Sequence, residues 1–340
     1  MKGNIIITGF QGFIGIYTTA RLINEDYIVY GVDKDKADKF KFKLLESLII
    51  DKTRLSTHLK TFFDFDLTQN SLKDLELINL DIVNKKVIDM VIHYASPVGV
   101  KLIQDEPYQT LKDALTINMS IDDYCTRYNI PLIFSSSSEV FGTIDNIIGV
   151  DLNNDYRIKQ SSRGTYAAQK MTSELLFANN PNYASANIRF FNIVGFGQTT
   201  EGMVMNTFIN NIFKGIPMRI YENTRRTFCA VEDAVEMIIE VVDKLIIPTG
   251  ISNKKYSFNI GAPENFFNEL YIKDLAKKIV DIYNKEIINN KTYENDILDL
   301  TSNDGYITRR KLHRTGLMFD NFTHIDKIIK NYLLKVQSFN

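Results

Sequence analysis

Short runs of β-branched and aromatic residues alternate along the chain with longer stretches that carry apolar residues at every third or fourth position. The short runs predict strands, and the longer stretches predict helices with one buried face. The predicted strands are residues 4–8, 27–32, 60–64, 88–94, 131–135, 186–190 and 256–260, and the predicted helices are residues 13–24, 107–128, 165–179, 204–214 and 231–245. Strands and helices that alternate at this spacing form a parallel sheet covered on both sides. The pattern therefore predicts an α/β protein with a doubly wound parallel sheet.

The pattern loosens in the second half of the chain. Residues 195–202 form a glycine-rich and threonine-rich loop, and the tail from residue 263 onward is rich in Asn, Lys and Asp. The lysine-rich stretch 34–43 is interrupted by Asp and Phe, which predicts a solvated loop or the solvated face of a helix. No linker of low complexity separates the two halves, so we expect an interleaved unit with two lobes.

The charge of the chain is nearly balanced. It has 340 residues, with 40 Lys and Arg against 41 Asp and Glu, a formal net charge of −1 and 44% hydrophobic residues. This composition is typical of a folded globular protein, and it lacks the positive charge that attracts proteins to the nucleic-acid backbone. The apolar runs are shorter than the roughly 20 residues of a membrane-spanning helix. We therefore expect neither a nucleic-acid partner nor a membrane association.

The two cysteines, Cys125 and Cys229, are isolated in the sequence. Neither has a CxxC spacing or a nearby histidine, and the four histidines are scattered along the chain. We therefore predict no metal site. Isolated thiols are typical of a reducing compartment, and the amino terminus has no apolar segment of signal-peptide length. We expect a cytoplasmic protein.

A glycine-rich turn follows the first predicted strand. Gly9, Gly12 and Gly15 lie where the strand 4–8 gives way to the helix 13–24. In such a turn, backbone N–H groups and the amino end of the helix face a pyrophosphate group. Glycines can also serve only to form a turn, but the strand before them and the helix after them match the dinucleotide-binding arrangement. The turn therefore predicts a dinucleotide cofactor.

The second predicted strand ends in Asp33. A carboxylate at this place accepts hydrogen bonds from the ribose hydroxyls of adenosine and repels a 2′-phosphate, so it favours NAD over NADP. Lys34 and Lys36 follow directly, and their positive charge favours NADP instead. The alternative is that Asp33 only caps a turn. We predict NAD as the cofactor.

Candidate chemistry lies in the middle of the chain. Tyr166 and Lys170 are four residues apart in the predicted helix 165–179, so their side chains share one face. A cation beside a phenol lowers its pKa and makes it a usable acid or base. The strand 131–135 leads into a run of serines and then Glu139, at the strand end where open α/β sheets bind ligands. A surface pair and a solvated glutamate are the alternatives, and the serine run favours a catalytic site.

Together these features resemble the extended short-chain dehydrogenase/reductases, the NAD-dependent nucleotide-sugar epimerase/dehydratase family. The resemblance spans nearly the whole chain and rests on Thr8-Gly9-x-x-Gly12-Phe13-Ile14-Gly15, Asp33, Asp66-Leu67, residues 91–96, Ser137, Tyr166 with Lys170, and Arg189-x-x-Asn192. It implies a Rossmann-type sheet with a smaller, interleaved C-terminal lobe. Residues 1–192 and 226–262 would form the NAD-binding domain, and residues 193–225 and 263–340 would form the nucleotide-sugar-binding lobe.

The resemblance also implies roles for individual residues. Ser137 would hydrogen-bond the sugar hydroxyl, Tyr166 would remove its proton, and Lys170 would hold the nicotinamide ribose. Glu139 would be the fourth catalytic residue. Tyr166 and Lys170 would also contact the cofactor, together with Gly9, Gly12, Phe13, Ile14, Gly15, Asp33, Asp66, Leu67 and Ala95. Contacts with the substrate would come from Ser138, Arg163, Asn192 and Arg226.

Members of this family oxidise a sugar hydroxyl, usually at C4, and differ in what the resulting ketone then does. The segment Ser138-Glu139-Val140-Phe141-Gly142 resembles both the UDP-glucuronate decarboxylases and the GDP-mannose 4,6-dehydratases. Arg163 and Arg226 lean toward the decarboxylases, where Arg226 would orient the carboxylate. We therefore expect a UDP-glucuronate decarboxylase type. A 4,6-dehydratase, a 4-epimerase and a non-catalytic NAD(H)-binding sensor are the alternatives.

The chain departs from the decarboxylases in two places. They carry Gly-Pro-Arg and Asp-Gly-Arg where this chain has Gly195-Phe196-Gly197-Gln198 and Glu201-Gly202-Met203. Two basic positions are thus missing from the substrate lobe, which leaves the identity of the acidic sugar open. The helices 107–128 and 165–179 resemble the pair through which many family members dimerise, so we expect a homodimer.

Overall fold

The structure is a computed structural model that describes residues 1–74, 88–141, 162–199, 202–220, 224–246, 253–263, 268–288, 297–299, 312 and 316–339. Its strands are β1 Gly3–Thr8, β2 Tyr27–Val32, β3 Leu59–Phe62, β4 Met90–His93, β5 Leu132–Ser137, β6 Ser185–Phe190, β7 Ile193–Val194, β8 Met218–Ile220, β9 Arg225–Thr227, β10 Cys229–Ala230, β11 Lys255–Ile260, β12 Glu269–Tyr271 and β13 Ile297–Asp299. Its helices are α1 Phe13–Asn24, α2 Lys39–Leu48, α3 Thr53–His58, α6 Val100–Asp105, α7 Pro107–Tyr128, η1 Ser138–Phe141 (a 3₁₀ turn), α8 Ser162–Asn179, α9 Val204–Lys214, α10 Val231–Ile246, α11 Ile272–Glu286 and α12 Ile325–Phe339.

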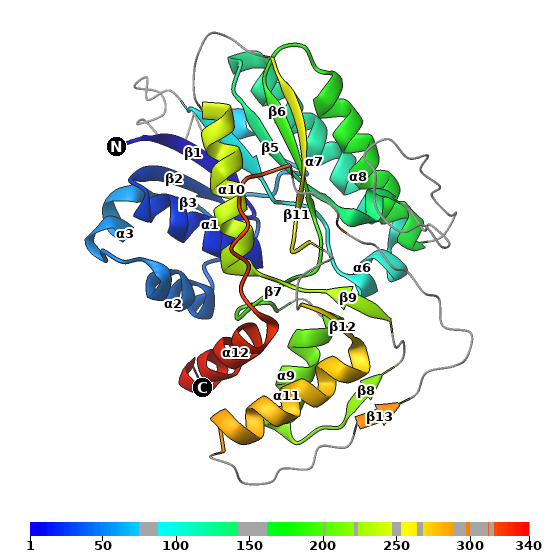
Figure 1. Cartoon of the computed structure of the whole chain (residues 1–340). Coiled ribbons are helices and arrows are strands. Elements are labelled where there is room, and N and C mark those ends of the chain that lie inside the picture. The colour runs from blue at the N-terminus through cyan, green and yellow to red at the C-terminus, as the bar shows by residue number, and fades with distance from the viewer. Residues whose placement is uncertain are drawn as a thin grey trace.

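A seven-stranded sheet of order β11-β6-β5-β4-β1-β2-β3 runs through the molecule (Figure 1). All neighbouring strands in it are parallel, which confirms the predicted doubly wound α/β fold. The chain runs outward from β1 to β3 and then returns to the other side of β1 with β4. Open parallel sheets bind ligands at such a reversal, beyond the carboxyl ends of the strands. The topology therefore places the candidate site beyond Thr8 of β1 and His93 of β4.

The two faces of the sheet pack against different helices. Ile5 and Ile7 of β1 share a hydrophobic cluster with α1 and α10, whereas Ile6 shares another with α7 and α8. Successive residues of a strand point to opposite faces, so this run of three isoleucines is buried on both sides. Burial of one such side chain contributes about 1.5–3 kcal/mol. The sheet is therefore a rigid platform for the residues at its carboxyl edge.

The helices α9, α11 and α12 gather below the central sheet in Figure 1, together with the paired strands β8 with β13 and β9 with β12. Helix α11 packs on both α9 and α12, and apolar residues of all three join the cluster that also contains α1 and α10. The chain passes from this group through β10 into α10 and β11, which belong to the central layers. The two groups of elements therefore alternate along the sequence.

Some boundaries differ from the predicted ones. Strand β3 ends at Phe62 rather than at residue 64, where Asp64 takes a left-handed backbone conformation with φ +53°. Strand β5 continues through the serines to Ser137, because its parallel pairing with β6 uses backbone groups whatever the side chains are. The lysine-rich stretch becomes helical from Lys39 onward, and Asp38 caps that helix by accepting the Lys41 N–H at 3.1 Å.

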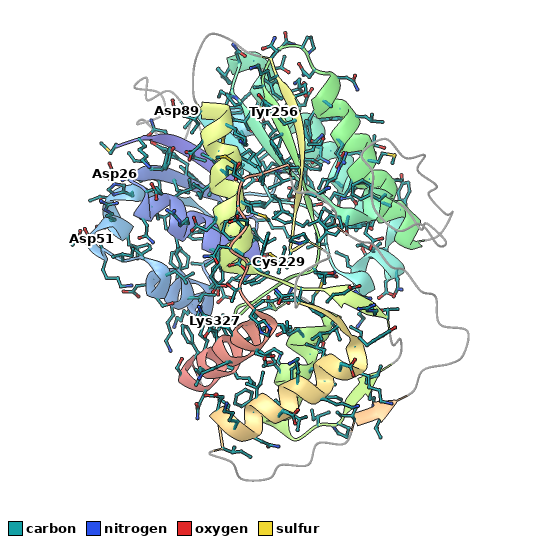
Figure 2. The ribbon with its side chains drawn as sticks, in the orientation of Figure 1. Asp26, Asp51, Asp89, Cys229, Tyr256 and Lys327 are labelled. Carbon is teal, nitrogen blue, oxygen red and sulfur yellow. The ribbon has the colours of Figure 1, made fainter. Side chains whose placement is uncertain are left out.

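Carboxylates fasten the amino-terminal edge of the sheet, opposite to the candidate site. Asp26 precedes β2 and Asp89 precedes β4, and both are labelled in Figure 2. The Asp26 carboxylate lies 2.8 Å from the amino-terminal ammonium and 3.1 Å from Nε2 of His58. Asp89 accepts the backbone N–H of Asn4 at 2.7 Å. These contacts hold the strand starts and leave the carboxyl edge for ligands.

The two cysteines are buried free thiols in the described chain. Figure 2 shows Cys229, in β10, near the place where the central sheet meets the lower group of helices. Burial raises the pKa of both Cys125 and Cys229, which keeps the thiols protonated and unreactive. None of the described helices is long and apolar enough to cross a membrane.

Candidate active site

Neighbouring backbone atoms pack so tightly against the glycine turn that two of its glycines have no room for a side chain. Gly9 has φ +68°, and a Cβ there would lie 2.8 Å from the backbone nitrogen of Ala95. A Cβ on Gly15 would lie 2.5 Å from the carbonyl oxygen of Gly9. The turn therefore brings bare backbone to the amino end of α1, which begins at Phe13. This cradle fits the pyrophosphate of a dinucleotide.

Asp33 lies at the carboxyl end of β2 and is only 8% exposed. Its Oδ2 accepts the backbone N–H of Gln11 at 3.0 Å, and its Oδ1 accepts that of Asp35 at 3.2 Å. Burial raises its pKa, while these two hydrogen bonds oppose the rise. Each oxygen keeps a second lone pair, so the carboxylate can still accept a ribose hydroxyl. Asp33 thus fits the adenosine side of NAD.

The other predicted cofactor residues flank this cradle. Phe13 and Ile14 open α1 and are partly buried, and Ala95 lies against Gly9 with its N–H 3.1 Å from the carbonyl oxygen of Thr8. Leu67 is buried, at 5% exposure. The Asp66 carboxylate accepts hydrogen bonds from both the N–H and the hydroxyl of Thr68, at 2.9 Å each. Asp66 thus shapes the turn after β3.

Tyr166 and Lys170 of α8 face the end of β5, as the helical spacing predicts. The Ser137 hydroxyl, at the last residue of β5, hydrogen-bonds the phenol of Tyr166. The Lys170 ammonium donates to the carbonyl oxygen of Ser135 at 2.8 Å and lies 5.8 Å from the centroid of the Tyr166 ring. The structure therefore brings a hydroxyl, a phenol and an amine together at the carboxyl edge of the sheet.

The pKa of Tyr166 moves in the opposite direction from the expected one. Burial raises it to about 12, the hydrogen bond from Ser137 lowers it, and the charge of Glu139 raises it again. Burial also lowers the pKa of Lys170 to about 7, which the nearby Glu174 carboxylate opposes. Lys170 is thus only partly charged near neutral pH. Before the cofactor binds, Lys170 therefore carries less than the full positive charge that its spacing from Tyr166 led us to expect.

Glu139 and Ser138 lie in η1, directly after β5. The backbone N–H of Glu139 donates to Oγ of Ser137 at 3.2 Å, and both Ser138 and Glu139 are partly exposed. The 3₁₀ turn places the Glu139 carboxylate close enough to act on the pKa of Tyr166. Residues 142–161, which follow this turn, lie outside the described part of the chain.

The predicted substrate residues approach the same edge from other elements. Asn192 comes two residues after Phe190, which pairs with Ser137 in the sheet, and its Nδ2 donates to the carbonyl oxygen of Thr227 at 3.1 Å. This bond brings β9, with Arg226, to the end of β6. Arg226 is partly buried, with Nε 3.4 Å from the hydroxyl of Thr224. The side chain of Arg163 lies outside the described residues.

A buried chain of hydrogen bonds connects β1 to α8, and sequence reasoning missed it. Thr8 Oγ1 lies 2.6 Å from His93 Nδ1, and His93 Nε2 lies 2.8 Å from Asn118 Oδ1. Asn118 Nδ2 donates to the hydroxyl of Ser173 at 2.5 Å, which donates to the carbonyl oxygen of Gln169 at 2.8 Å. Burial lowers the pKa of His93 to about 3, so the imidazole is neutral. The partners are far apart in sequence, so no local spacing reveals them.

A buried ion pair lies one helical turn beyond Lys170. Arg189 of β6 donates to Glu174 of α8 at 2.8 Å from Nε and 2.6 Å from Nη2. Both residues are under 10% exposed, and the guanidinium lies 4.9 Å from the centroid of the Phe141 ring. The pair ties α8 and η1 to the sheet. Arg189 belongs to the motif quoted above, but the sequence did not predict its partner.

Fold and site together define a dinucleotide-dependent enzyme in which a serine hydroxyl, a tyrosine and a lysine lie at the carboxyl edge of the sheet. Residues 5–261 match the model of the NAD dependent epimerase/dehydratase family. The protein belongs to this family, and its cofactor is NAD. This confirms the resemblance drawn from the glycine turn, Asp33 and the Tyr166–Lys170 pair.

Individual relatives agree with this assignment. Protein CapI from Staphylococcus aureus is 29% identical over 272 residues, which cover 74% of this chain and 72% of that protein. A UDP-N-acetyl-alpha-D-glucosaminuronate decarboxylase from Bacillus cytotoxicus is 26% identical over 256 residues, covering 72% and 73%. The solved structure of a UDP-glucuronic acid 4-epimerase from Bacillus cereus, in complex with UDP-glucuronic acid and NAD, matches with a TM-score of 0.75 and 18% identity and covers 99% of this chain and all of that chain. This last likeness concerns the fold.

Proposed function

We propose that the protein acts on a nucleotide sugar through a 4-keto intermediate and is of the UDP-glucuronate decarboxylase type. The observation that carries the proposal is the position of Glu139, two residues after the serine that hydrogen-bonds Tyr166 and close enough to affect its pKa. A carboxylate at this place provides a second acid or base beside the redox pair. The similarity to a decarboxylase named for a UDP-linked hexuronate supports the same reaction class.

The chemistry follows from the groups at the carboxyl edge. NAD, when bound, accepts a hydride from C4 of the sugar. The phenolate form of Tyr166 takes the proton of the C4 hydroxyl, and the hydroxyl of Ser137 donates a hydrogen bond to the C4 oxygen. The C4 ketone is β to the C6 carboxylate, so cleavage of the C5–C6 bond releases CO₂ and leaves the electron pair as an enolate. Tyr166 and Ser137 donate hydrogen bonds to the enolate oxygen, and Glu139 assists the return of a proton to C5. When the hydride returns to C4, Tyr166 gives its proton back to the C4 oxygen.

The substrate would be held between the two groups of elements. We propose that residues 1–192 and 226–262 bind NAD and that residues 193–225 and 263–340 bind the nucleotide sugar. Arg226, which the Asn192–Thr227 hydrogen bond brings to the sheet edge, would orient the carboxylate, and Ser138 would contact the sugar. A guanidinium suits a carboxylate because it can donate two parallel hydrogen bonds.

The proposal is tested by turnover of the purified protein with NAD and a panel of sugars. UDP-glucuronate, UDP-N-acetylglucosaminuronate, GDP-mannose, UDP-glucose and dTDP-glucose are incubated separately, and the product masses are measured. Loss of the mass of CO₂ from a uronate supports the decarboxylase. Loss of water indicates a 4,6-dehydratase. No turnover with any sugar, together with tight NAD binding, indicates a sensor.

A 4-epimerase acting on a UDP-hexuronate is the second candidate. It is favoured by the glycine-rich segment Gly195-Phe196-Gly197-Gln198, which lacks the arginine that decarboxylases carry there. The fold also matches a solved 4-epimerase that holds UDP-glucuronic acid. This enzyme would return the hydride to the other face of C4 without losing the carboxylate. A new diastereomer of unchanged mass, resolved by chromatography, distinguishes it.

The role of Glu139 gives a separate prediction. Glu139→Gln preserves the size of the side chain but removes the proton-transferring carboxylate, so it is expected to spare the first oxidation and to slow product formation by about a hundredfold. Rapid-mixing absorbance of reduced nicotinamide measures the oxidation, and product mass measures the later step. Glu106→Gln, at the start of α7, is the control. Full turnover of Glu139→Gln would rule out this role.

We also propose that the protein is a homodimer that pairs through α7 and α8. The two helices lie side by side in Figure 1, and each exposes a large apolar side chain, Met119 at 62% and Leu175 at 58%. A second copy would cover them. Light scattering is expected to give twice the chain mass, and Met119→Glu with Leu175→Glu to give the mass of one chain. Ile50→Glu, at a residue after α2 that is more exposed than either, should leave the dimer intact.

A further inference from the structure

The side chain of Gln11, inside the glycine turn, is almost completely buried and makes three hydrogen bonds to a segment that lies well beyond it in the sequence. Its exposure is 2%. Its Nε2 donates to the carbonyl oxygens of Asp35 at 3.4 Å and Lys36 at 3.2 Å, and its Oε1 accepts the N–H of Asp38 at 2.9 Å. All its hydrogen-bonding groups thus face the segment that connects β2 to α2.

The backbone N–H of Gln11 also hydrogen-bonds a residue that follows β2. Its N–H donates to Oδ2 of Asp33, whose Oδ1 accepts the N–H of Asp35. The Asp33 carboxylate is therefore held from two sides, by the glycine turn and by its own following loop. Residues 33–38 and the turn form one hydrogen-bonded unit, and Gln11 supplies most of the bonds between them.

The segment that connects β2 to α2 also carries two lysines whose positive charge favours NADP. Lys34 and Lys36 follow Asp33 and are exposed. A cation near the adenosine ribose accommodates a 2′-phosphate, whereas the carboxylate repels it. The position of the Lys36 backbone relative to Asp33 therefore affects whether NAD or NADP is preferred. The side-chain amide of Gln11 fixes that position by donating to the carbonyl oxygen of Lys36.

We propose that Gln11 is a specificity-determining residue that favours NAD over NADP by fixing the segment 35–38 and the orientation of Asp33. An amide suits this task because it donates and accepts at once, which a hydrophobic residue of similar length cannot do. Without these bonds, three partly buried backbone groups lose their partners and the segment relaxes. Asp33 can then turn away, and Lys34 or Lys36 can approach a 2′-phosphate.

The test is a binding titration with the purified full chain and no sugar. Isothermal titration calorimetry measures Kd for NAD and for NADP with the wild type and Gln11→Met. Gln11→Met is expected to weaken NAD binding about tenfold, the loss equivalent to one or two net hydrogen bonds, while NADP binding is unchanged or tighter. The preference for NAD, measured as the Kd for NADP divided by the Kd for NAD, therefore falls about tenfold or more. Gln109→Met, at an exposed glutamine of α7, is the control and should leave both values unchanged.

Two further variants make the outcome decisive. Gln11→Glu retains an acceptor for Asp38 but loses the donor to the two carbonyls, and it is expected to lower the ratio in the same direction. Adding Lys34→Ala and Lys36→Ala to Gln11→Met should remove any gain in NADP affinity. Asp33→Ala gives the ratio expected when the carboxylate is gone. Far-UV circular dichroism verifies folding of each variant.

The opposite result is equally clear. If Gln11→Met or Gln11→Glu weakens NAD and NADP by the same factor, Gln11 only supports the turn and the proposal fails. It also fails if neither affinity changes. The titration contains no sugar, so its result does not depend on whether the protein is a decarboxylase. The role proposed for Gln11 and the proposed decarboxylation can therefore fail independently.

Discussion

Replacing Tyr166 with phenylalanine is expected to lower turnover of the nucleotide sugar by about a thousandfold, the range that removal of a positioned acid or base produces. The ring remains beside Lys170, whose ammonium lies 5.8 Å from its centroid, so packing is retained. What disappears is the hydroxyl that Ser137 hydrogen-bonds. The loss should therefore fall on the first redox step and leave NAD binding within a few-fold of the wild type.

The two quantities are measured separately. Product mass gives turnover, and calorimetric titration gives NAD affinity. Tyr128→Phe, which removes the hydroxyl of a partly exposed tyrosine at the end of α7, should keep full turnover. If Tyr166→Phe kept turnover near the wild-type value, the acid–base role of Tyr166 would be wrong. If it lost NAD affinity as severely as turnover, the hydroxyl would be a binding group instead.

The second large effect is expected from the buried pair Glu174–Arg189. Arg189→Ala should lower the free energy of unfolding by about 3–5 kcal/mol, because it leaves a buried carboxylate without its partner. Glu174→Ala should cost a similar amount for the reverse reason. The double replacement by methionine removes both charges and should be much closer to the wild type, since an apolar pair of similar volume is often neutral. Urea denaturation followed by circular dichroism measures each value.

An exposed pair on the same protein calibrates this prediction. Lys278 and Asp326 lie 2.7 Å apart, but their side chains are 36% and 50% exposed. Water and salt screen such a pair, so Lys278→Ala should cost less than about 1 kcal/mol. Equal costs for Lys278→Ala and Arg189→Ala would show that burial does not set the energetics of the Arg189 pair.

The periodicity of the sequence predicted most of the central elements. Helices α1, α7 and α9 and strand β2 have the predicted boundaries, because each repeats a strong apolar pattern between clear ends. Helices α11 and α12 were not predicted, since the polar composition of the tail obscured them. The buried residues Leu275, Ala276 and Ile279 of α11 do have helical spacing, so a signal for that helix was present but was outweighed by composition.

Some features of the candidate site were visible in the sequence, and others appeared only in the folded structure. The glycine turn, Asp33 and the Tyr166–Lys170 pair are short patterns whose chemistry is visible in the sequence, and the family match confirms the NAD enzyme that they imply. The individual roles of the catalytic, cofactor and substrate residues, Tyr166 and Lys170 included, stay predictions, as do the two lobes and the dimer. Long-range partners, such as Asn118 for His93, were invisible because no local rule relates them.

By itself the sequence determined the doubly wound sheet, the dinucleotide turn and the tyrosine–lysine pair, because these depend on periods and spacings within a few residues. Only the tertiary structure decided what surrounds them. Burial moves the pKa of Tyr166 up and that of Lys170 down, and the fold pairs Arg189 with Glu174 and directs Gln11 onto the segment after β2. Desolvation and contacts between distant residues exist only once the chain has folded, so no spacing along the chain encodes them directly.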